Sequence, residues 1–532
     1  MPEMDPGPDS ASPAVTGHQP DPDHRAGGDA ADEDQSALNK ARLDRADSIV
    51  LAIVCLAQFM VVLDISIVNV ALPSIQKSLG FTAANLQWVV TAYALTFGGL
   101  LLLGGRLADL FGRRRILLIG LILFTGASLV GGFAQNQGTL IAARSLQGIG
   151  AAVLSPATLT ILTVTFTEQR ARAKALGVWS AVAAGGGAAG SLFGGFLTQY
   201  LSWRWILFVN VPIGIVLFLF ARLYLVESRA DGPRQRLDLA GSVTVTAGLL
   251  ALVYTIVHTD QVSWTSHSTL LTGTIAVVLL AAFVTIEARL ATYPLVPLRM
   301  FRSRALTVAN LVMFCFGVAM FAMWFFLSLY LQQVLGYDPV VTGLTFIPQT
   351  AAIAIGATLA GRLAPKVGPR NVLVVGSLFA AAGLYWLSFI QAGDTYWTGA
   401  CGGGIIATFG MGLALTPIAL SATGGVRREE AGLASGLVNS SRQIGASLGL
   451  AVLSTVAATH IAALLAGHPA TPEAERIAMT AGYARGFLIA SIVALAAGLL
   501  ALLIPRQVSA GAPLAAQASA ITETPTAPLL ES

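Results

Sequence analysis

Asp64 is an acidic residue that lies deep inside an apolar stretch of the chain, residues 49–72. The other acidic residues fall in loops, in the terminal segments or at the ends of apolar stretches. A charged Asp near the centre of a membrane helix costs about 2.5–3.5 kcal/mol on insertion scales, and such residues are usually functional. Burial favours the protonated form of a carboxylic acid, so Asp64 is a candidate proton carrier. A structural or helix-capping Asp is the alternative interpretation.

Arg144 is a candidate partner for this acid. It lies five residues after Thr139 in a second apolar stretch, residues 139–165, and Asp64 lies eight residues before Leu72. If the two stretches are antiparallel helices, a rise of 1.5 Å per residue places both charges about 8–12 Å below the same membrane surface. The two side chains can then interact directly or through water. A purely structural interhelical hydrogen bond is the alternative for Arg144.

A second deep arginine lies in the apolar stretch 432–458. Arg442 can either bind an anionic group of a substrate or pair with carbonyl groups and Asn439. The other residues predicted to line a substrate cavity are Asn69, Gln147 and Trp324. Because only one embedded acid is found, the sequence predicts a preference for monovalent cationic or neutral lipophilic substrates.

The composition indicates a membrane protein. Of 532 residues, 55% are hydrophobic and 11% are charged, whereas soluble proteins carry roughly 25% charged residues. This deficit of charge excludes a large cytosolic enzyme. The three cysteines lie far apart in apolar stretches and show neither metal-binding nor disulfide spacing. The sequence also lacks a phosphate-binding loop that ends in Lys-Ser/Thr. No metal, nucleotide or organic cofactor is expected.

Fourteen apolar stretches are long enough to cross the roughly 30 Å of hydrocarbon as helices. They are 49–72, 85–104, 115–134, 139–165, 173–198, 204–226, 239–258, 269–288, 306–332, 341–361, 371–390, 396–421, 432–458 and 484–505. The segments 1–47 and 506–532 show no such pattern and are predicted to be disordered tails.

The charges of the connecting loops support this count. Loops predicted to share one side contain 20 Lys and Arg residues, and those on the other side contain four, Lys77, Arg204, Arg476 and Arg485. Cytoplasmic loops of membrane proteins carry an excess of Lys and Arg. The sequence therefore predicts a multi-pass protein of the plasma (inner) membrane with both termini in the cytoplasm. The basic excess is explained without a nucleic-acid partner.

An internal repeat divides the membrane domain. The segment GRLADLFGRRRILLIG from Gly105 recurs from Gly361 as GRLAPKVGPRNVLVVG, with eight of sixteen positions identical. Parallel repeats of this kind occur in secondary transporters. The repeat predicts a six-helix bundle over 48–228, two additional helices with their loops over 229–300, and a second six-helix bundle over 301–505.

The first copy of the repeat resembles motif A of the major facilitator superfamily. In that family the loop is a conformational latch, which the resemblance carries onto Gly105, Asp109, Gly112, Arg113 and Arg114. The stretch from Leu63 to Pro73 is similar to the helix 1 motif of the fourteen-span drug:proton antiporter branch (EmrB/QacA-like). Gly190, Gly194 and Gly195 resemble the glycines of the antiporter motif, although Ser191 stands where the family has Pro.

The resemblance implies an all-α polytopic protein of the major facilitator fold with about fourteen transmembrane helices. It further implies proton-coupled export of lipophilic drugs or antibiotics from the cytoplasm by alternating access. In this mechanism Asp64 and Arg144 are the residues that couple proton movement to substrate export. The expected partners are a small lipophilic substrate, protons and membrane lipids, and the protein is expected to function as a monomer and not as an enzyme. The alternative is a proton-coupled importer or exporter of a specific metabolite.

Overall fold

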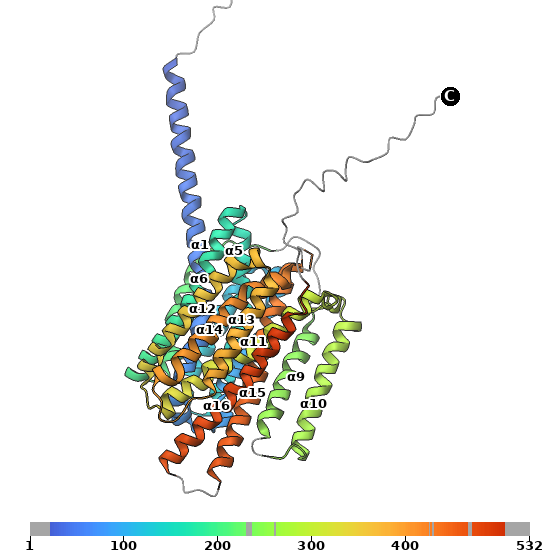
Figure 1. Ribbon diagram of the computed structural model, residues 1–532. Coiled ribbons are helices and arrows are strands. Elements are labelled where there is room, and N and C mark those ends of the chain that lie inside the picture. Colours follow the sequence, from blue (N-terminus) through green and yellow to red (C-terminus); the bar gives the residue numbers. More distant parts are fainter. Residues whose placement is uncertain are drawn as a thin grey trace, which may run out of the picture. The chain divides into compact units, whose positions relative to one another are not determined.

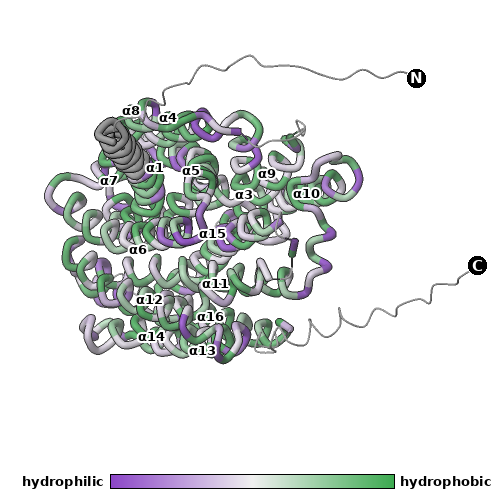
Figure 2. Tube along the Cα trace, turned by 90° about the horizontal axis from the view of Figure 1, so that it is seen from above, coloured by the Kyte–Doolittle hydropathy of each residue, from purple (hydrophilic) through white to green (hydrophobic). Residues whose placement is uncertain are grey.

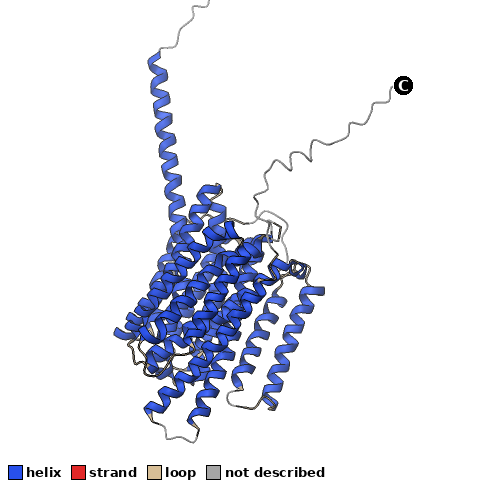
Figure 3. Ribbon diagram, viewed as in Figure 1, coloured by secondary structure: helices blue, strands red, loops and turns tan. Residues whose placement is uncertain are grey.

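The computed structural model describes residues 22–229, 237–259, 262–424, 426–427, 430–466 and 471–505. All the regular secondary structure in these ranges is helical (Figure 3). The elements are α1 (Pro22–Leu79), α2 (Ala83–Leu86), α3 (Trp88–Phe111), α4 (Arg113–Gly132), α5 (Gln137–Thr165), α6 (Gln169–Tyr200), α7 (Trp205–Phe208), α8 (Asn210–Tyr224), α9 (Leu239–His258), α10 (His267–Thr285), η1 (Ile286–Leu290), η2 (Leu298–Arg302), α11 (Arg304–Leu329), η3 (Tyr330–Val334), α12 (Pro339–Val367), α13 (Pro369–Leu387), η4 (Tyr396–Cys401), α14 (Gly402–Thr423), α15 (Ala431–Leu465) and α16 (Pro472–Ala501).

Fourteen helices in the described part of the chain are long and apolar enough to cross a membrane, as the sequence predicted. The last of them begins at Pro472 rather than near residue 484, so Arg476 and Arg485 lie within α16 and not in a loop. The helix begins early because the Thr471 hydroxyl caps it by accepting a hydrogen bond from the Ala474 N–H, and Pro472 fits the first turn.

The N-terminal segment differs in part from its prediction as a disordered tail. The chain divides into two units, residues 1–49 and 50–532. Residues 1–21 lie outside the described residues, but α1 begins at Pro22. The stretch that follows is rich in Ala, Asp, Glu, Arg and Lys, several of which are strong helix formers. The C-terminal segment predicted to be disordered, 506–532, also lies outside the described residues.

The membrane helices form two six-helix bundles and one additional pair. Seen end-on in Figure 2, α1, α3, α4, α5 and α8 lie on one side, and α11, α12, α13, α14 and α16 lie on the other. The pair α9 and α10 lies beside the bundles (Figure 1), with α9 packed against α3 and α15. Most of the apolar side chains of α10 are exposed, as expected of a helix that faces lipid.

Glycines of α6 allow this helix to pack closely against α1 of its own bundle and against α12 of the second bundle. A Cβ atom at Gly190 would lie 2.6 Å from the Cβ of Ser66, and one at Gly194 would lie 2.7 Å from the carbonyl oxygen of Ile67. At Gly195 it would collide with the backbone of Pro339 in α12. Small residues let membrane helices approach in this way. The close approach of α6 to α1 lies immediately beside Asp64.

The two bundles contact each other near the end opposite the arginine-rich loops that follow α3 and α12. There the Ser328 hydroxyl donates to the carbonyl oxygen of Asn69 at 2.7 Å, and Gln332 Nε2 donates to that of Val70 at 2.8 Å. Toward the arginine-rich end, a Cβ atom at Gly177 of α6 or Gly361 of α12 would meet no atom within 4 Å. The bundles are therefore joined between α1 and α11 at one end, whereas Gly177 and Gly361 border open space toward the other.

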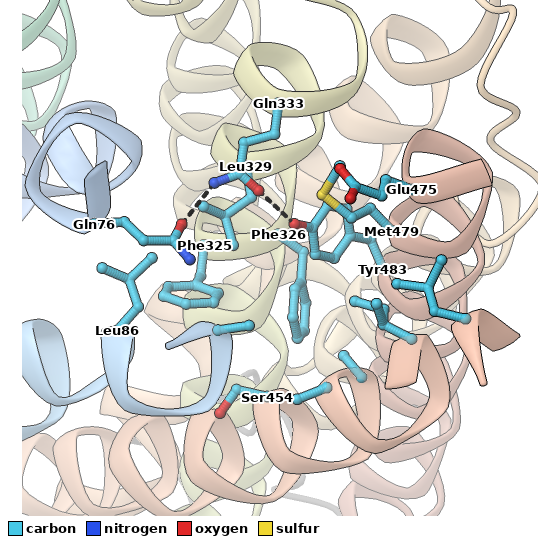
Figure 4. A pocket seen from close by; sticks show the side chains of 15 residues that line it. Gln76, Leu86, Phe325, Phe326, Leu329, Gln333, Ser454, Glu475, Met479 and Tyr483 are labelled. Carbon is cyan, nitrogen blue, oxygen red and sulfur yellow. Dashed lines mark hydrogen bonds between the residues drawn. The ribbon is translucent and has the colours of Figure 1, made fainter. Parts of the chain in front are cut away.

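A chain of hydrogen bonds continues this closure around a cavity of about 200 Å³ (Figure 4). Gln333 Nε2 donates to Gln76 Oε1 at 2.7 Å, and Tyr483 Oη donates to Gln333 Oε1 at 2.8 Å. Gln333 thus connects α1 of the first bundle with α16 of the second. The rest of the lining is mainly apolar and includes Phe325 and Phe326.

Replacing Gln333 by Leu should weaken this closure. Only the hydrogen bond to Gln76 crosses between the bundles. Its net value of about 0.5–1.5 kcal/mol should shift the equilibrium about 2- to 13-fold toward a state open at this end. The measurement is the labelling rate of a cysteine introduced at Ser454, which lines the cavity, by a membrane-impermeant maleimide. Gln137→Leu is the matched control, because Gln137 binds only carbonyl groups of its own bundle. Equal labelling rates in the two variants would contradict the assignment.

Candidate functional site

The carboxylate of Asp64 lies inside the first bundle and is fully buried, with 0% of the residue exposed. Its Oδ2 accepts a hydrogen bond from Arg144 Nη1 at 2.5 Å. Its Oδ1 accepts from Gln147 Nε2 at 3.1 Å and from Asn210 Nδ2 at 2.9 Å. The acid predicted from its depth is therefore held by donors from α5 and α8, and it has no contact with solvent.

Arg144 is fixed by further partners. Its Nε donates to the carbonyl oxygen of Val89 at 3.0 Å, and its Nη1 also donates to Gln147 Oε1 at 3.0 Å. The guanidinium carbon lies 4.5 Å from the centre of the Tyr93 ring, which is a cation–π contact. Arg144 is only 1% exposed, so the ion pair with Asp64 is shielded from solvent on both sides.

Ser128 and Asn210 complete this network, and the sequence analysis missed both. The Ser128 hydroxyl accepts hydrogen bonds from Gln147 Nε2 at 3.0 Å and Asn210 Nδ2 at 3.1 Å, and it donates to the carbonyl oxygen of Leu207 at 2.8 Å. The sequence signal that could have revealed Asn210 is the presence of a polar Asn within the apolar stretch 204–226. The network joins α1, α4, α5, α7 and α8.

The remaining predicted cavity residues lie in separate places. Gln147 belongs to the Asp64 network and is fully buried. Asn69 donates to the carbonyl oxygen of Ile65 in its own helix at 3.1 Å, close to the contact between α1 and α11. Trp324 packs edge-on against Phe346, with 4.8 Å between the ring centres. The structure thus brings together Asp64, Arg144 and Gln147, but not the other two.

Arg442 and Asn439 form a second polar group in α15. Arg442 Nη2 donates to Asn439 Oδ1 at 2.8 Å. The arginine is partly exposed, and its Nε has no acceptor. In the part of the chain that the structure describes, no carboxylate lies within 4 Å of this guanidinium.

The loop between α3 and α4 contains the residues predicted to form a latch. Gly105 packs next to Pro156, and Asp109 Oδ1 accepts from Arg113 Nη2 at 3.4 Å. Gly112 ends α3 with a φ of +108°. Arg114 donates from Nη2 to the carbonyl oxygen of Arg222, which lies near the end of α8.

Residues 54–450 match the model of the Major Facilitator Superfamily. The chain belongs to this superfamily. It is 44% identical over 408 residues to the cephamycin export protein CmcT of Amycolatopsis lactamdurans, covering 76% of this chain and 84% of that protein. It is 42% identical over 456 residues to the puromycin resistance protein pur8 of Streptomyces alboniger, covering 85% of this chain and 89% of that protein.

The fold of this Major Facilitator Superfamily member is also found in solved structures. A bacterial homologue of the human lysosomal transporter Spinster, in an inward-facing and occupied conformation, superposes with a TM-score of 0.62. The match covers 86% of this chain and 96% of the other, with 18% sequence identity. At this identity the likeness concerns the fold alone.

Glu227 binds the loop that was predicted to form a latch, and the sequence analysis missed this residue. Its Oε1 accepts a hydrogen bond from the backbone N–H of Arg114 at 3.2 Å, and its Oε2 accepts from that of Arg115 at 3.1 Å. A carboxylate at the N-terminus of a helix satisfies free N–H groups and interacts favourably with the helix dipole. Glu227 therefore joins the segment after α8 to the start of α4. An acid between Arg222 and Arg229 was the available sequence signal.

Replacing Gly112 by Ala should destabilise the protein more than the equivalent change at Gly368 in the second repeat. Both glycines have positive φ, +108° and +86°, which costs a side-chain-bearing residue about 1–3 kcal/mol. A Cβ atom at Gly112 would also collide with the Glu227 carboxylate, whereas one at Gly368 would meet nothing within 4 Å. Loss of the cap adds about 0.5–2 kcal/mol. Thermal unfolding in detergent measures the difference, and equal melting temperatures would contradict the role of Glu227.

Proposed function

We propose that this superfamily member is a proton-coupled secondary transporter that exports lipophilic drugs or antibiotics from the cytoplasm across the plasma membrane by alternating access. The observation that carries the proposal is the buried ion pair between Asp64 and Arg144, 2.5 Å apart, on separate helices of one bundle. An embedded carboxylate is rare, costly and suited to carrying a proton. The printed names of the relatives, cephamycin export and puromycin resistance, support the choice of substrate class.

The proposed cycle uses this chain's own residues. Asp64 takes up a proton when a change of conformation admits water to it, and Arg144 then loses its counter-charge. The substrate would enter between α6 and α12 from the arginine-rich side, and the contact at Gln333 would open to release it. By the excess of Lys and Arg, the arginine-rich side and both termini are assigned to the cytoplasm. The transporter is proposed to act as a monomer in lipid, without a nucleic-acid partner.

Transport by inside-out membrane vesicles tests the proposal. Vesicles from cells with and without the chain are energised to be acidic inside, and uptake is measured for a panel that includes puromycin and a cephamycin. Uptake that requires the chain and collapses when a protonophore removes the pH gradient supports the proposal. Equal uptake in both vesicle preparations for every compound would overturn it. Uptake of a metabolite alone would favour the alternative, a specific metabolite transporter.

A further inference from the structure

The second bundle contains a deep cation that no acidic residue of the described chain neutralises. Arg442 lies eleven residues after the first residue of α15, Ala431, which is about 16 Å along the helix at 1.5 Å per residue. Arg144 of the first bundle is paired with Asp64, but none of the ion pairs within 4 Å among the described residues includes Arg442. A deep arginine normally finds a partner, because an isolated charge in the membrane interior is costly.

Several polar groups near Arg442 have no hydrogen-bond partner. They are Arg442 Nε, the Tyr93 hydroxyl and both amide atoms of Gln443. Tyr93 is 2% exposed and Gln443 is 1% exposed, so solvent does not satisfy them freely. Their helices contact each other, because a Cβ atom at Gly98 of α3 would lie 2.7 Å from the Cβ of Gln443 in α15. The Tyr93 hydroxyl also lies within electrostatic range of the Arg442 guanidinium.

The two arginines differ in whether a ligand can reach them. Arg442 is partly exposed, whereas Arg144 and Asp64 are buried and occupied by each other. A substrate therefore meets the unneutralised cation and not the carboxylate. The sequence analysis predicted monovalent cationic or neutral substrates because it found a single embedded acid. The structure argues against cationic substrates, because Arg144 already balances the charge of Asp64.

We propose that Arg442 binds the acidic group of the substrate, so that the preferred substrates are lipophilic organic anions such as aromatic carboxylates. The planar guanidinium can donate two parallel hydrogen bonds to a carboxylate. The Tyr93 hydroxyl and the Gln443 amide are buried polar groups of this region that have no partner in this structure. The inference rests on the proposed function and specifies its substrate class.

This substrate class changes how a membrane potential acts on transport. Export of one anion with entry of one proton moves two charges in the direction that an inside-negative potential favours. For each 60 mV of potential, the attainable concentration ratio of an anion should rise about 100-fold, since one charge gives a tenfold change per 59 mV. A monovalent cation exchanged for one proton moves no net charge, and its ratio should not respond.

The test uses one aromatic scaffold in three forms, a carboxylate, its methyl ester and the corresponding amine. The full-length protein is reconstituted in vesicles of neutral phosphatidylcholine, and transport is measured with a pH gradient and a membrane potential imposed separately. We expect at least a tenfold lower KM for the carboxylate than for the ester. For each 60 mV, the concentration ratio should change about 100-fold for the carboxylate, about tenfold for the neutral ester and not at all for the amine. Preference for the amine, or no preference among the forms, would overturn the inference.

Three variants assign the preference to Arg442. Arg442→Gln should raise the KM for the carboxylate at least tenfold and leave ester transport unchanged, which also shows that the variant is folded. Asn439→Asp should have the same effect on the carboxylate and improve amine transport, because the new acid stands 2.8 Å from the guanidinium. Arg362→Gln removes an exposed charge of the same bundle and should change nothing. Equal effects of Arg362→Gln and Arg442→Gln would contradict a local binding site.

Further experiments distinguish a soluble anionic substrate from a lipid headgroup. They also distinguish failure of this inference from failure of the proposed function. If the site instead binds a lipid headgroup, adding phosphatidylglycerol to the vesicles should inhibit carboxylate transport in the wild type and not ester transport, and this result would overturn a soluble substrate as the occupant. If ester or amine is transported under a pH gradient without preference for the carboxylate, only the inference fails. If no form is transported under a pH gradient, the proposed function fails.

Discussion

Replacing Asp64 by Asn abolishes proton-driven transport, with an expected fall of at least 100-fold in vesicles energised by a pH gradient. The amide keeps the shape of the carboxylate and can accept a hydrogen bond from Arg144, but it cannot take up a proton at physiological pH. Counterflow of substrate without a pH gradient, which needs no proton, should persist. Proton-driven transport at wild-type rates would remove Asp64 from the coupling role.

The same variant should lose stability, because Arg144 then becomes a buried charge without its counter-ion. Breaking a buried ion pair by removing one partner typically costs 3–5 kcal/mol. The double variant Asp64→Asn with Arg144→Gln removes both charges and should recover most of the melting temperature, while proton-driven transport stays absent. This control separates coupling from folding. If the double variant regains transport together with stability, the loss in the single variant was a folding defect.

Replacing Arg144 by Lys should lower turnover about 10- to 100-fold, although the charge is kept. Lysine can reach Asp64 as a point charge, but it loses the hydrogen bond from Nε to Val89 and the planar stacking on Tyr93. Those two contacts contribute about 2–5 kcal/mol. Turnover as a function of the pH gradient measures the effect.

Arg204→Lys is the matched control for this substitution. Arg204 also donates to a backbone carbonyl, that of Ala134 at 2.8 Å, and lies 4.5 Å from the centre of the Trp203 ring. It belongs to the same bundle but not to the Asp64 network. Arg204→Lys should therefore leave turnover near the wild-type value. An equal loss in both variants would mean that the effect comes from weaker packing rather than from the ion pair.

Hydropathy, loop charge and helix geometry predicted the membrane helices and the common depth of Asp64 and Arg144. These signals give the position of a residue along a helix axis. They do not give the direction in which its side chain points, which depends on how neighbouring helices pack. Gln147 shows the difference, because its depth suggested a place on the cavity, yet its side chain binds Asp64 and Ser128 inside the bundle.

Partners from distant segments were harder to predict for the same reason. Asn210 meets Asp64 across 146 positions of sequence, and Glu227 meets the N-terminus of α4 across 113. No local pattern specifies such pairs. The early start of α16 was missed because a capped polar turn precedes its apolar stretch, and hydropathy alone registers only the latter.

The location of the Asp64 network within a single bundle has a consequence for how resistance can evolve. The Asp64 network lies in α1, α4, α5 and α8, whereas Arg442 and Asn439 belong to the other half of the molecule. With the proposed roles of Asp64 and Arg442, substitutions in α11, α12 or α15 could alter which compounds are exported without disturbing proton coupling. A population exposed to a new antibiotic could thus change its spectrum of tolerance through one half of the gene while the other half stays constant.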